Sequence, residues 1–109
     1  MSAFNSLKSE ITCPTCGRAG TFDIQFKYGE TWQHQYMIGD RLHWGGNEVG
    51  TPGVSEVQVQ GLGGPCPICG ADFQQFSVII RNDKIVAVRP VSNAEYEAME
   101  PKGFLVVAR

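Results

Sequence analysis

The four cysteines of the chain fall into two copies of one short motif, Cys-Pro-x-Cys-Gly. The first copy spans 13–17 and the second spans 66–70. Two thiolates three residues apart can bind one metal ion from the same side, and two such pairs complete a tetrahedral set of sulfurs. Proline after the first cysteine fixes φ, and glycine after the second permits a turn through positive φ. The spacing therefore predicts one metal site formed by Cys13, Cys16, Cys66 and Cys69.

Each motif resembles the knuckle turn of zinc ribbons and rubredoxins. The stretch 66–76, CPICGADFQQF, is also similar to the second knuckle of a rubredoxin with its trailing aromatic residue. The resemblance implies either a structural zinc ion or an iron ion used for electron transfer, because tetrahedral S4 geometry suits both. The segment between the motifs is longer than in the small rubredoxin domain, so we expect one structural Zn²⁺, with iron as the alternative.

Composition indicates a single domain over residues 1–109. The hydrophobic content of 42% is enough for the chain to fold, and a domain of this size gains stability from a metal staple. The formal net charge is -2 and there is no block of basic residues, which disfavours nucleic acid as a partner. The sequence shows neither a signal-peptide pattern nor an apolar stretch of membrane-spanning length. We therefore expect a cytoplasmic protein, with no membrane partner, whose reduced cysteines bind metal rather than form disulfides.

Alternating hydrophobicity predicts a mainly β fold (β-rich α+β), with an antiparallel sheet and one or two short helices. Residues 21–28 alternate apolar and polar side chains, and residues 32–38 alternate again. An antiparallel meander is the simplest arrangement of these two strands. A strand at 54–60 completes an inserted sheet over 21–60, which would carry the two knuckles together in an elaborated zinc ribbon. The glycine-rich stretch 45–53 lacks the lysine and helix of a phosphate-binding loop, and a plain connection is the simpler interpretation.

The clearest hairpin lies at 76–89. A two-residue loop at Asn82-Asp83 would place Ile80 opposite Ile85. A three-residue loop would instead gather the larger apolar side chains of both strands on one face. We favour the second register for that reason. The side chains it gathers are Phe76, Val78, Ile80, Val86 and Val88.

Helical signals occur near both ends of the chain. Apolar residues at i, i+3 and i+7 predict a short helix over Ser2–Glu10. Ser92 and Glu95 form a capping-box pattern at the start of a second helix, 93–100. A final apolar strand is predicted at 104–108.

Aromatic and acidic side chains suggest two candidate surfaces for a partner protein. Tryptophan and tyrosine are favoured as interface anchors, and an acidic strip could meet a basic partner. The simpler alternative places the aromatic side chains in the core and the glutamates on a solvated helix face. The candidate partner-binding residues are Trp32, Tyr36, Trp44, Glu95, Glu97 and Glu100.

Enzymatic activity is not expected. Four thiolates saturate a tetrahedral ion, and neither His34 nor His43 adjoins a recognisable nucleophile motif. The sequence instead favours a non-enzymatic, zinc-stabilised protein-binding module. An adaptor or an inhibitor, including the immunity or antitoxin class, would fit. A nucleic-acid-binding zinc ribbon and a rubredoxin-like iron electron carrier are the two alternatives.

Overall fold

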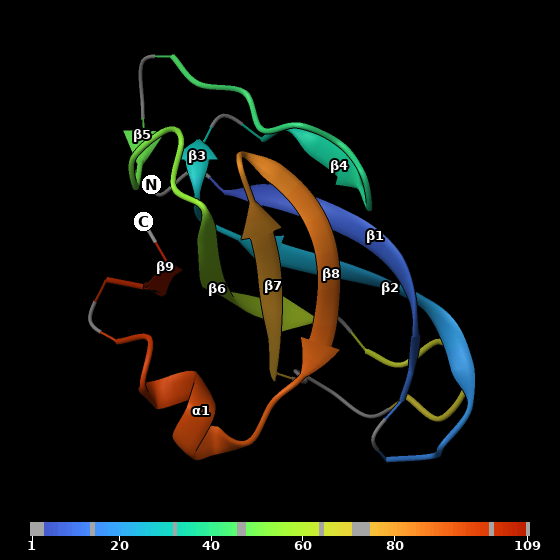
Figure 1. Ribbon diagram of the computed structural model, residues 1–109. Helices are drawn as coiled ribbons and strands as arrows, with labels where there is room; N and C mark the ends of the chain where they lie inside the picture. The colour runs from blue at the N-terminus through green and yellow to red at the C-terminus, as the bar shows by residue number, and fades with distance from the viewer. Residues whose placement is uncertain are drawn as a thin grey trace.

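The computed structural model describes residues 4–13, 15–31, 33–45, 48–63, 65–70, 75–100 and 102–108. Seven strands form one curled sheet in the order β4-β1-β2-β6-β7-β8, with β9 paired beside β6, while β3 and β5 form a separate pair (Figure 1). This arrangement confirms the predicted mainly β single domain. The elements are β1 (Asn5–Thr12), β2 (Ala19–Phe26), β3 (Gly29–Glu30), β4 (Gln35–Met37), β5 (Glu48–Val49), β6 (Glu56–Gly63), β7 (Gln75–Arg81), β8 (Lys84–Pro90), α1 (Asn93–Glu97) and β9 (Phe104–Ala108).

Strand β6 is the centre of the sheet, because three other strands pair with it. Strand β7 pairs along one edge of β6, antiparallel, over residues 57–62. On the other edge, β9 pairs with residues 56–59 and β2 pairs with residues 61–63. Among the described residues, sheet pairing joins the hairpins β1–β2 and β6–β7 through three residue pairs: Ile24↔Gly63, Gln25↔Leu62 and Phe26↔Gly61.

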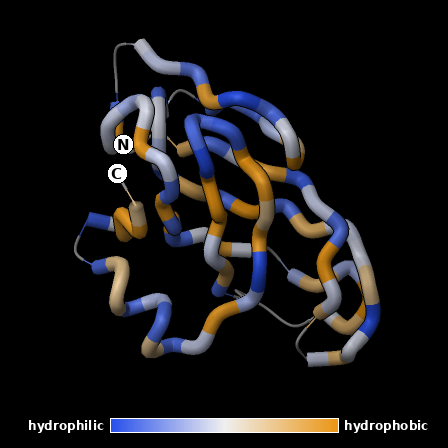
Figure 2. Tube along the Cα trace, in the orientation of Figure 1, coloured by the Kyte–Doolittle hydropathy of each residue, from blue (hydrophilic) through white to orange (hydrophobic). Residues whose placement is uncertain are grey.

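The core fills the inside of the curl. Hydrophobic stretches alternate with hydrophilic ones along the strands in Figure 2, as expected for a sheet with one buried face. The alternation predicted in 21–28 is confirmed, since Phe22, Ile24, Phe26 and Tyr28 are buried while the residues between them are exposed. Phe22 packs edge-to-face on Phe76 of β7, with ring centroids 5.6 Å apart. This contact connects the two hairpins through their side chains.

The segment that follows β4 closes the curl at one end. The Gly39 amide donates to the Ile85 carbonyl at 2.7 Å, and the Ile85 amide donates to the Asp40 carbonyl at 3.0 Å. An isolated antiparallel bridge joins Arg41 and Lys84. Residues from the β4 side of the sheet thus bond to the start of β8, at the opposite side.

The short helix predicted over Ser2–Glu10 is wrong, because residues 5–12 form β1, which pairs with β2 along its whole length. Leu7 and Ile11 are both buried. Their spacing of four residues fits a helical period and also a period of two. Pairing with β2 decides between the two.

The predicted meander is also wrong. Strand β4 pairs with β1, in parallel, while the partners of β2 are β1 on one edge and β6 on the other. The buried Asn5 side chain holds the connection between β2 and β4. Its Nδ2 donates to the carbonyls of Tyr28 at 3.0 Å and Glu30 at 3.1 Å, and its Oδ1 accepts from the His34 amide at 3.1 Å.

The β7–β8 hairpin combines the two registers that the sequence allows. Its loop is the two-residue one, with Asn82 and Asp83 at positive φ and Ile80 opposite Ile85. The prediction of a three-residue loop is therefore wrong. A register shift at Ile79/Ile80 then moves the pairing by one residue, so that Val78 lies opposite Val88. The bulge therefore allows a two-residue turn and, beyond it, the register in which Val78 faces Val88.

Helix α1 begins as predicted but ends earlier. The Glu95 amide donates to Ser92 Oγ at 3.2 Å, and the Ser92 amide donates to Glu95 Oε1 at 3.4 Å, which completes the capping box. The helix ends at Glu97 rather than at residue 100, and turns continue to Glu100. Met99 in those turns is buried. The predicted strand at 104–108 is confirmed as β9.

Gly61→Ala should destabilise the junction between the hairpins. A Cβ at this position would lie 2.6 Å from Ile24 Cγ2 and 3.3 Å from Val78 Cγ2, so β2 and β6 would have to separate. We expect a loss of about 1–3 kcal/mol in the free energy of unfolding, the usual range for overpacking, measured by urea denaturation. Gln58→Ala in the same strand is the control, with a smaller expected loss. An unchanged midpoint in Gly61→Ala would contradict this account of the junction.

Candidate metal centre

Both knuckles lie at the same end of the sheet. The first, 13–17, connects β1 to β2, and the second, 66–70, follows β6. Strands β2 and β6 are antiparallel: Gly63 at the end of β6 lies opposite Ile24, and Pro67 beyond it lies against Gly20 near the start of β2. In Figure 1 these segments are at the lower right, away from β3 and β5. Sheet topology therefore brings together two motifs that are distant in sequence.

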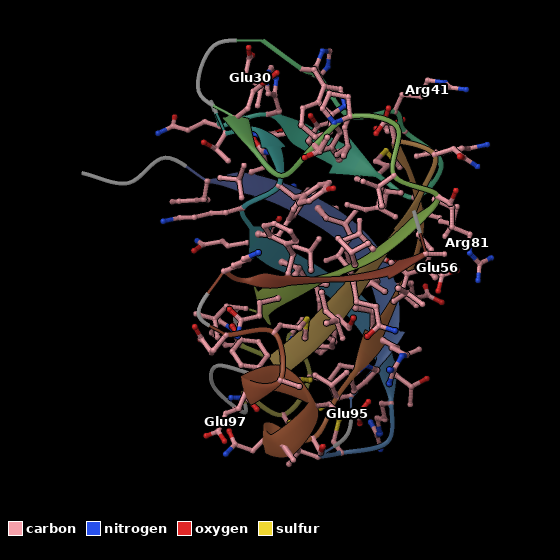
Figure 3. The ribbon with its side chains drawn as sticks, turned by 60° about the vertical axis from the view of Figure 1, so that its left-hand side comes forward. Glu30, Arg41, Glu56, Arg81, Glu95 and Glu97 are labelled. Carbon is pink, nitrogen blue, oxygen red and sulfur yellow. The ribbon has the colours of Figure 1, made fainter. Side chains whose placement is uncertain are left out.

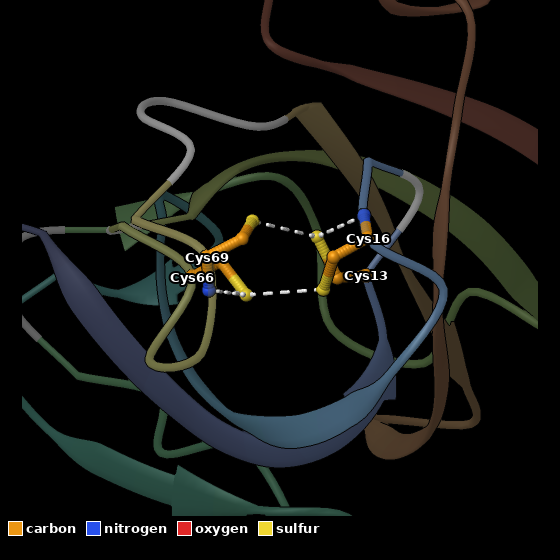
Figure 4. Close-up of side chains that lie close together, drawn as sticks. All are labelled: Cys13, Cys16, Cys66 and Cys69. Atoms are coloured by element: carbon orange, nitrogen blue, oxygen red, sulfur yellow. Dashed lines mark hydrogen bonds between the residues drawn. The ribbon is translucent and has the colours of Figure 1, made fainter.

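The four cysteine sulfurs converge on one point (Figure 4). All four lie within 4.8 Å of one another. Two separations are shorter: Cys13 Sγ to Cys69 Sγ is 3.9 Å, and Cys16 Sγ to Cys66 Sγ is 3.8 Å. A disulfide would need about 2.05 Å. Tetrahedral ligands at a zinc–sulfur distance of 2.3 Å lie about 3.8 Å apart, so the site has the dimensions of a four-thiolate metal centre.

In each knuckle, two backbone amides donate hydrogen bonds to the sulfur of the first cysteine. Cys13 Sγ accepts from the amides of Thr15 at 3.4 Å and Cys16 at 3.5 Å. Cys66 Sγ accepts from the amides of Ile68 at 3.4 Å and Cys69 at 3.5 Å. These bonds offset negative charge on the sulfurs of a thiolate site.

The glycines of the motifs take the predicted conformation. Gly17 has φ +74 and Gly70 has φ +76, and each donates its amide to the carbonyl of the first cysteine of its knuckle. Positive φ is the region in which glycine lacks the steric cost of other residues. The two turns therefore share one geometry, as their shared sequence predicts.

Hydrogen bonding favours the charged form of Cys66. The Cys69 amide, and with it the Ile68 amide, lowers the pKa of the Cys66 thiol, and partial desolvation opposes this effect. A lowered pKa keeps the thiolate populated to a lower pH than usual. Metal binding requires the thiolate, so the knuckle prepares this ligand for coordination.

One residue outside the motifs shapes the site and was missed by sequence analysis. Gly20 in β2 lies against the second knuckle, and a Cβ there would be 2.8 Å from Pro67 Cγ and 3.7 Å from Ile68 Cδ1. No local pattern marks this glycine, because the contact joins residues that are far apart in sequence.

The chain was compared with protein-family models, with curated proteins and with solved structures, and none of these comparisons finds a match. Within the described ranges, the cysteine set is the only group of three or more His, Cys, Asp or Glu residues whose ligand atoms converge closely enough to hold a metal ion. No helix in the described part of the chain is long and apolar enough to cross a membrane.

The aromatic partner-binding candidates differ in their placement. Tyr36 is buried and belongs to the core. Trp44 is half-buried and packs edge-to-face on Tyr28, with ring centroids 5.7 Å apart. Trp32 lies outside the described residues. Neither Tyr36 nor Trp44 presents a fully exposed ring that could anchor a partner without rearrangement.

The three glutamates are exposed, and each makes a contact within the chain. Glu95 pairs with Arg89 at 3.0 Å, which lowers the pKa of its carboxyl group. Glu100 accepts from Gln60 at 3.0 Å, and Glu97 accepts from Asn93 at 3.1 Å. In Figure 3, Glu95 and Glu97 lie at the α1 end of the molecule, remote from Glu30 and Arg41.

The two histidines, which adjoin no recognisable nucleophile motif in the sequence, form a second polar cluster in the structure. Their rings stack at 4.3 Å, and His34 Nε2 lies 2.8 Å from Glu30 Oε1. The His43 amide donates to the Tyr36 hydroxyl at 3.0 Å. Burial raises the pKa of Tyr36, which keeps this hydroxyl neutral. The cluster ties β3, β4 and the following loop together.

Replacing Cys16 or Cys69 with serine should abolish tight metal binding and strongly destabilise the fold, because one thiolate ligand is lost from the cross-link. We expect a loss of at least about 4 kcal/mol, the stabilisation supplied by a ligand present at a thousand times its Kd. Thermal unfolding and metal content measure the effect. Thr15→Ala is the matched control, since it keeps the knuckle backbone and all four sulfurs. A serine variant with normal stability would show that the cross-link is not structural.

Proposed function

We propose that the chain is a zinc protein in which four cysteine thiolates hold one Zn²⁺, and that it acts as a non-enzymatic protein-binding module. The observation that carries the metal site is the convergence of four sulfurs with separations of 3.8 and 3.9 Å. Zinc is proposed rather than iron because the segment between the two motifs is longer than in the small rubredoxin domain. A bound ion would supply a cross-link between the β1–β2 and β6–β7 hairpins, whose described residues form three sheet pairs with one another. Such a role is structural, because four protein ligands leave no open position for water or substrate.

The protein-binding half of the proposal is supported by exposed apolar side chains. Met37 is 66% exposed and Ile38 is 42% exposed, and they are the next two residues after the buried Tyr36. They line a hollow of about 420 Å³ beside Lys8 and Glu10 of β1. Apolar groups framed by charges of both signs suit the surface of another protein. An adaptor and an inhibitor both fall within this proposal.

Metal analysis tests the first half of the proposal. Protein purified without added metal should contain one zinc per chain and show no visible absorption. Removal of the metal with a chelator should lower the melting temperature. Acidification should also release the ion, because protons compete for the thiolates. Stoichiometric iron with sulfur-to-metal absorption would instead favour a rubredoxin-like electron carrier.

A paired substitution tests the second half. Met37→Ser combined with Ile38→Ser should reduce capture of a partner from an extract of the source cells at least about tenfold, equivalent to losing 1.4 kcal/mol of binding free energy. Leu105→Ser is the matched control, because Leu105 is 44% exposed on β9. Melting temperatures should be unchanged in both proteins. Equal capture by the two variants would place the partner elsewhere.

A further inference from the structure

Accessibility divides the four cysteines into two classes. Cys13 and Cys66 are buried, Cys16 is half-buried and Cys69 is exposed. Each knuckle therefore holds its first cysteine inside and its second toward solvent. A small oxidant in solution reaches the second cysteines, and Cys69 most readily.

The short sulfur contacts cross from one knuckle to the other. The exposed Cys69 lies 3.9 Å from the buried Cys13, and the half-buried Cys16 lies 3.8 Å from the buried Cys66. Each accessible sulfur thus has a buried sulfur of the opposite knuckle beside it (Figure 4). Formation of a disulfide between Cys13 and Cys69 requires these two atoms to approach by roughly 1.9 Å.

We propose that Cys69 is a site of oxidation by peroxides, and that its oxidation replaces the metal cross-link with a Cys13–Cys69 disulfide. The inference deepens the proposed function and rests on its zinc site. It names hydrogen peroxide, or another hydroperoxide, as the co-reactant. The oxidised chain loses its metal but keeps its two hairpins joined at the same point.

The chemistry balances in two steps. The Cys69 thiolate attacks one oxygen of hydrogen peroxide, the O–O bond breaks, and sulfenic acid and hydroxide form. The Cys13 thiolate then attacks the Cys69 sulfur, the S–O bond breaks, and a second hydroxide leaves. Two protons from solvent convert the hydroxides to water, and two electrons pass from the sulfurs to the peroxide. Only Cys16 and Cys66 then remain as thiolates, too few to hold the ion tightly.

The disulfide would preserve the architecture that the metal stabilises. It joins the end of β1 to the knuckle that follows β6, the same two segments that the four thiolates connect. A covalent link between distant residues restricts the unfolded chain and so stabilises the fold. The oxidised protein should therefore remain folded while its metal is released.

The experiment adds one equivalent of hydrogen peroxide to the full chain, loaded with zinc and freed of reductant. Zinc release is followed with 4-(2-pyridylazo)resorcinol, and a non-reduced tryptic digest is analysed by mass spectrometry. Trypsin places the first knuckle in the peptide 9–18 and the second in the peptide 42–81. We expect one zinc released for each disulfide formed, and a cross-linked product containing both peptides.

Dimedone, which traps sulfenic acids, identifies the first sulfur oxidised. It should label Cys69 in the wild-type chain. Cys16→Ser and Cys69→Ser form a matched pair, because each variant lacks the second, more accessible cysteine of one knuckle. The first variant should keep the dimedone label and the second should lose it. The wild-type label and cross-link remain informative even where a variant does not fold.

Three outcomes would overturn the inference. These are disulfides confined within each knuckle, dimedone on a cysteine other than Cys69, and zinc retained at an equivalent of peroxide. Zinc content before oxidation tests the proposed function separately. A chain that contains one zinc but resists peroxide refutes only the oxidation site. A chain without zinc refutes the metal assignment, while dimedone labelling still reports on Cys69.

Discussion

The structure depends on the narrow junction between β2 and β6. Two antiparallel hairpins, each paired along most of its length, meet there through three residue pairs in the part of the sheet that the structure describes. The junction is tight because Gly61 has no side chain where Ile24 and Val78 fill the space. A junction of so few backbone pairs gains from a second connection, and the cysteine cluster at the adjoining end of the two hairpins can provide one.

The cysteine cluster and the β2–β6 junction connect the same two hairpins. A metal ion would close a long loop between the knuckles, and closure of a long loop removes more entropy from the unfolded chain than closure of a short one. The knuckle backbone prepares the ligands independently of the metal, because its amides already point at Cys13 and Cys66. Each knuckle thus positions its own sulfurs through nearby residues, whereas a bound ion would stabilise the whole fold by joining the two hairpins.

Elements away from the metal centre are joined by polar side chains rather than by sheet pairing alone. Asn5 holds the crossing from β2 to β4, and the stacked His34 and His43 tie the following loop to β3. Buried polar groups such as Asn5 are tolerated when their hydrogen bonds are satisfied, and here both the amide nitrogen and the amide oxygen are used. Every Phe, Tyr and Trp side chain among the described residues is buried or half-buried, which is why the exposed Met37 and Ile38 mark the candidate partner surface.

Features that depend on neighbouring residues can be predicted from the amino-acid sequence. These are the two knuckle turns, the buried face of β2, the capping box at Ser92 and the last strand, because spacing and local backbone preference define each of them. Strand pairing, in contrast, depends on contacts between distant segments and is seen in the fold. Leu7 and Ile11 fit a helix or a strand equally well until β2 lies beside them. Strand β4 pairs with β1 and not with β2, whose two edges pair with β1 and β6. The motif spacing predicted the metal ligands, but the distances between them, the contact of Gly20 with Pro67 and the exposure of Cys69 arise from packing between segments far apart in the chain.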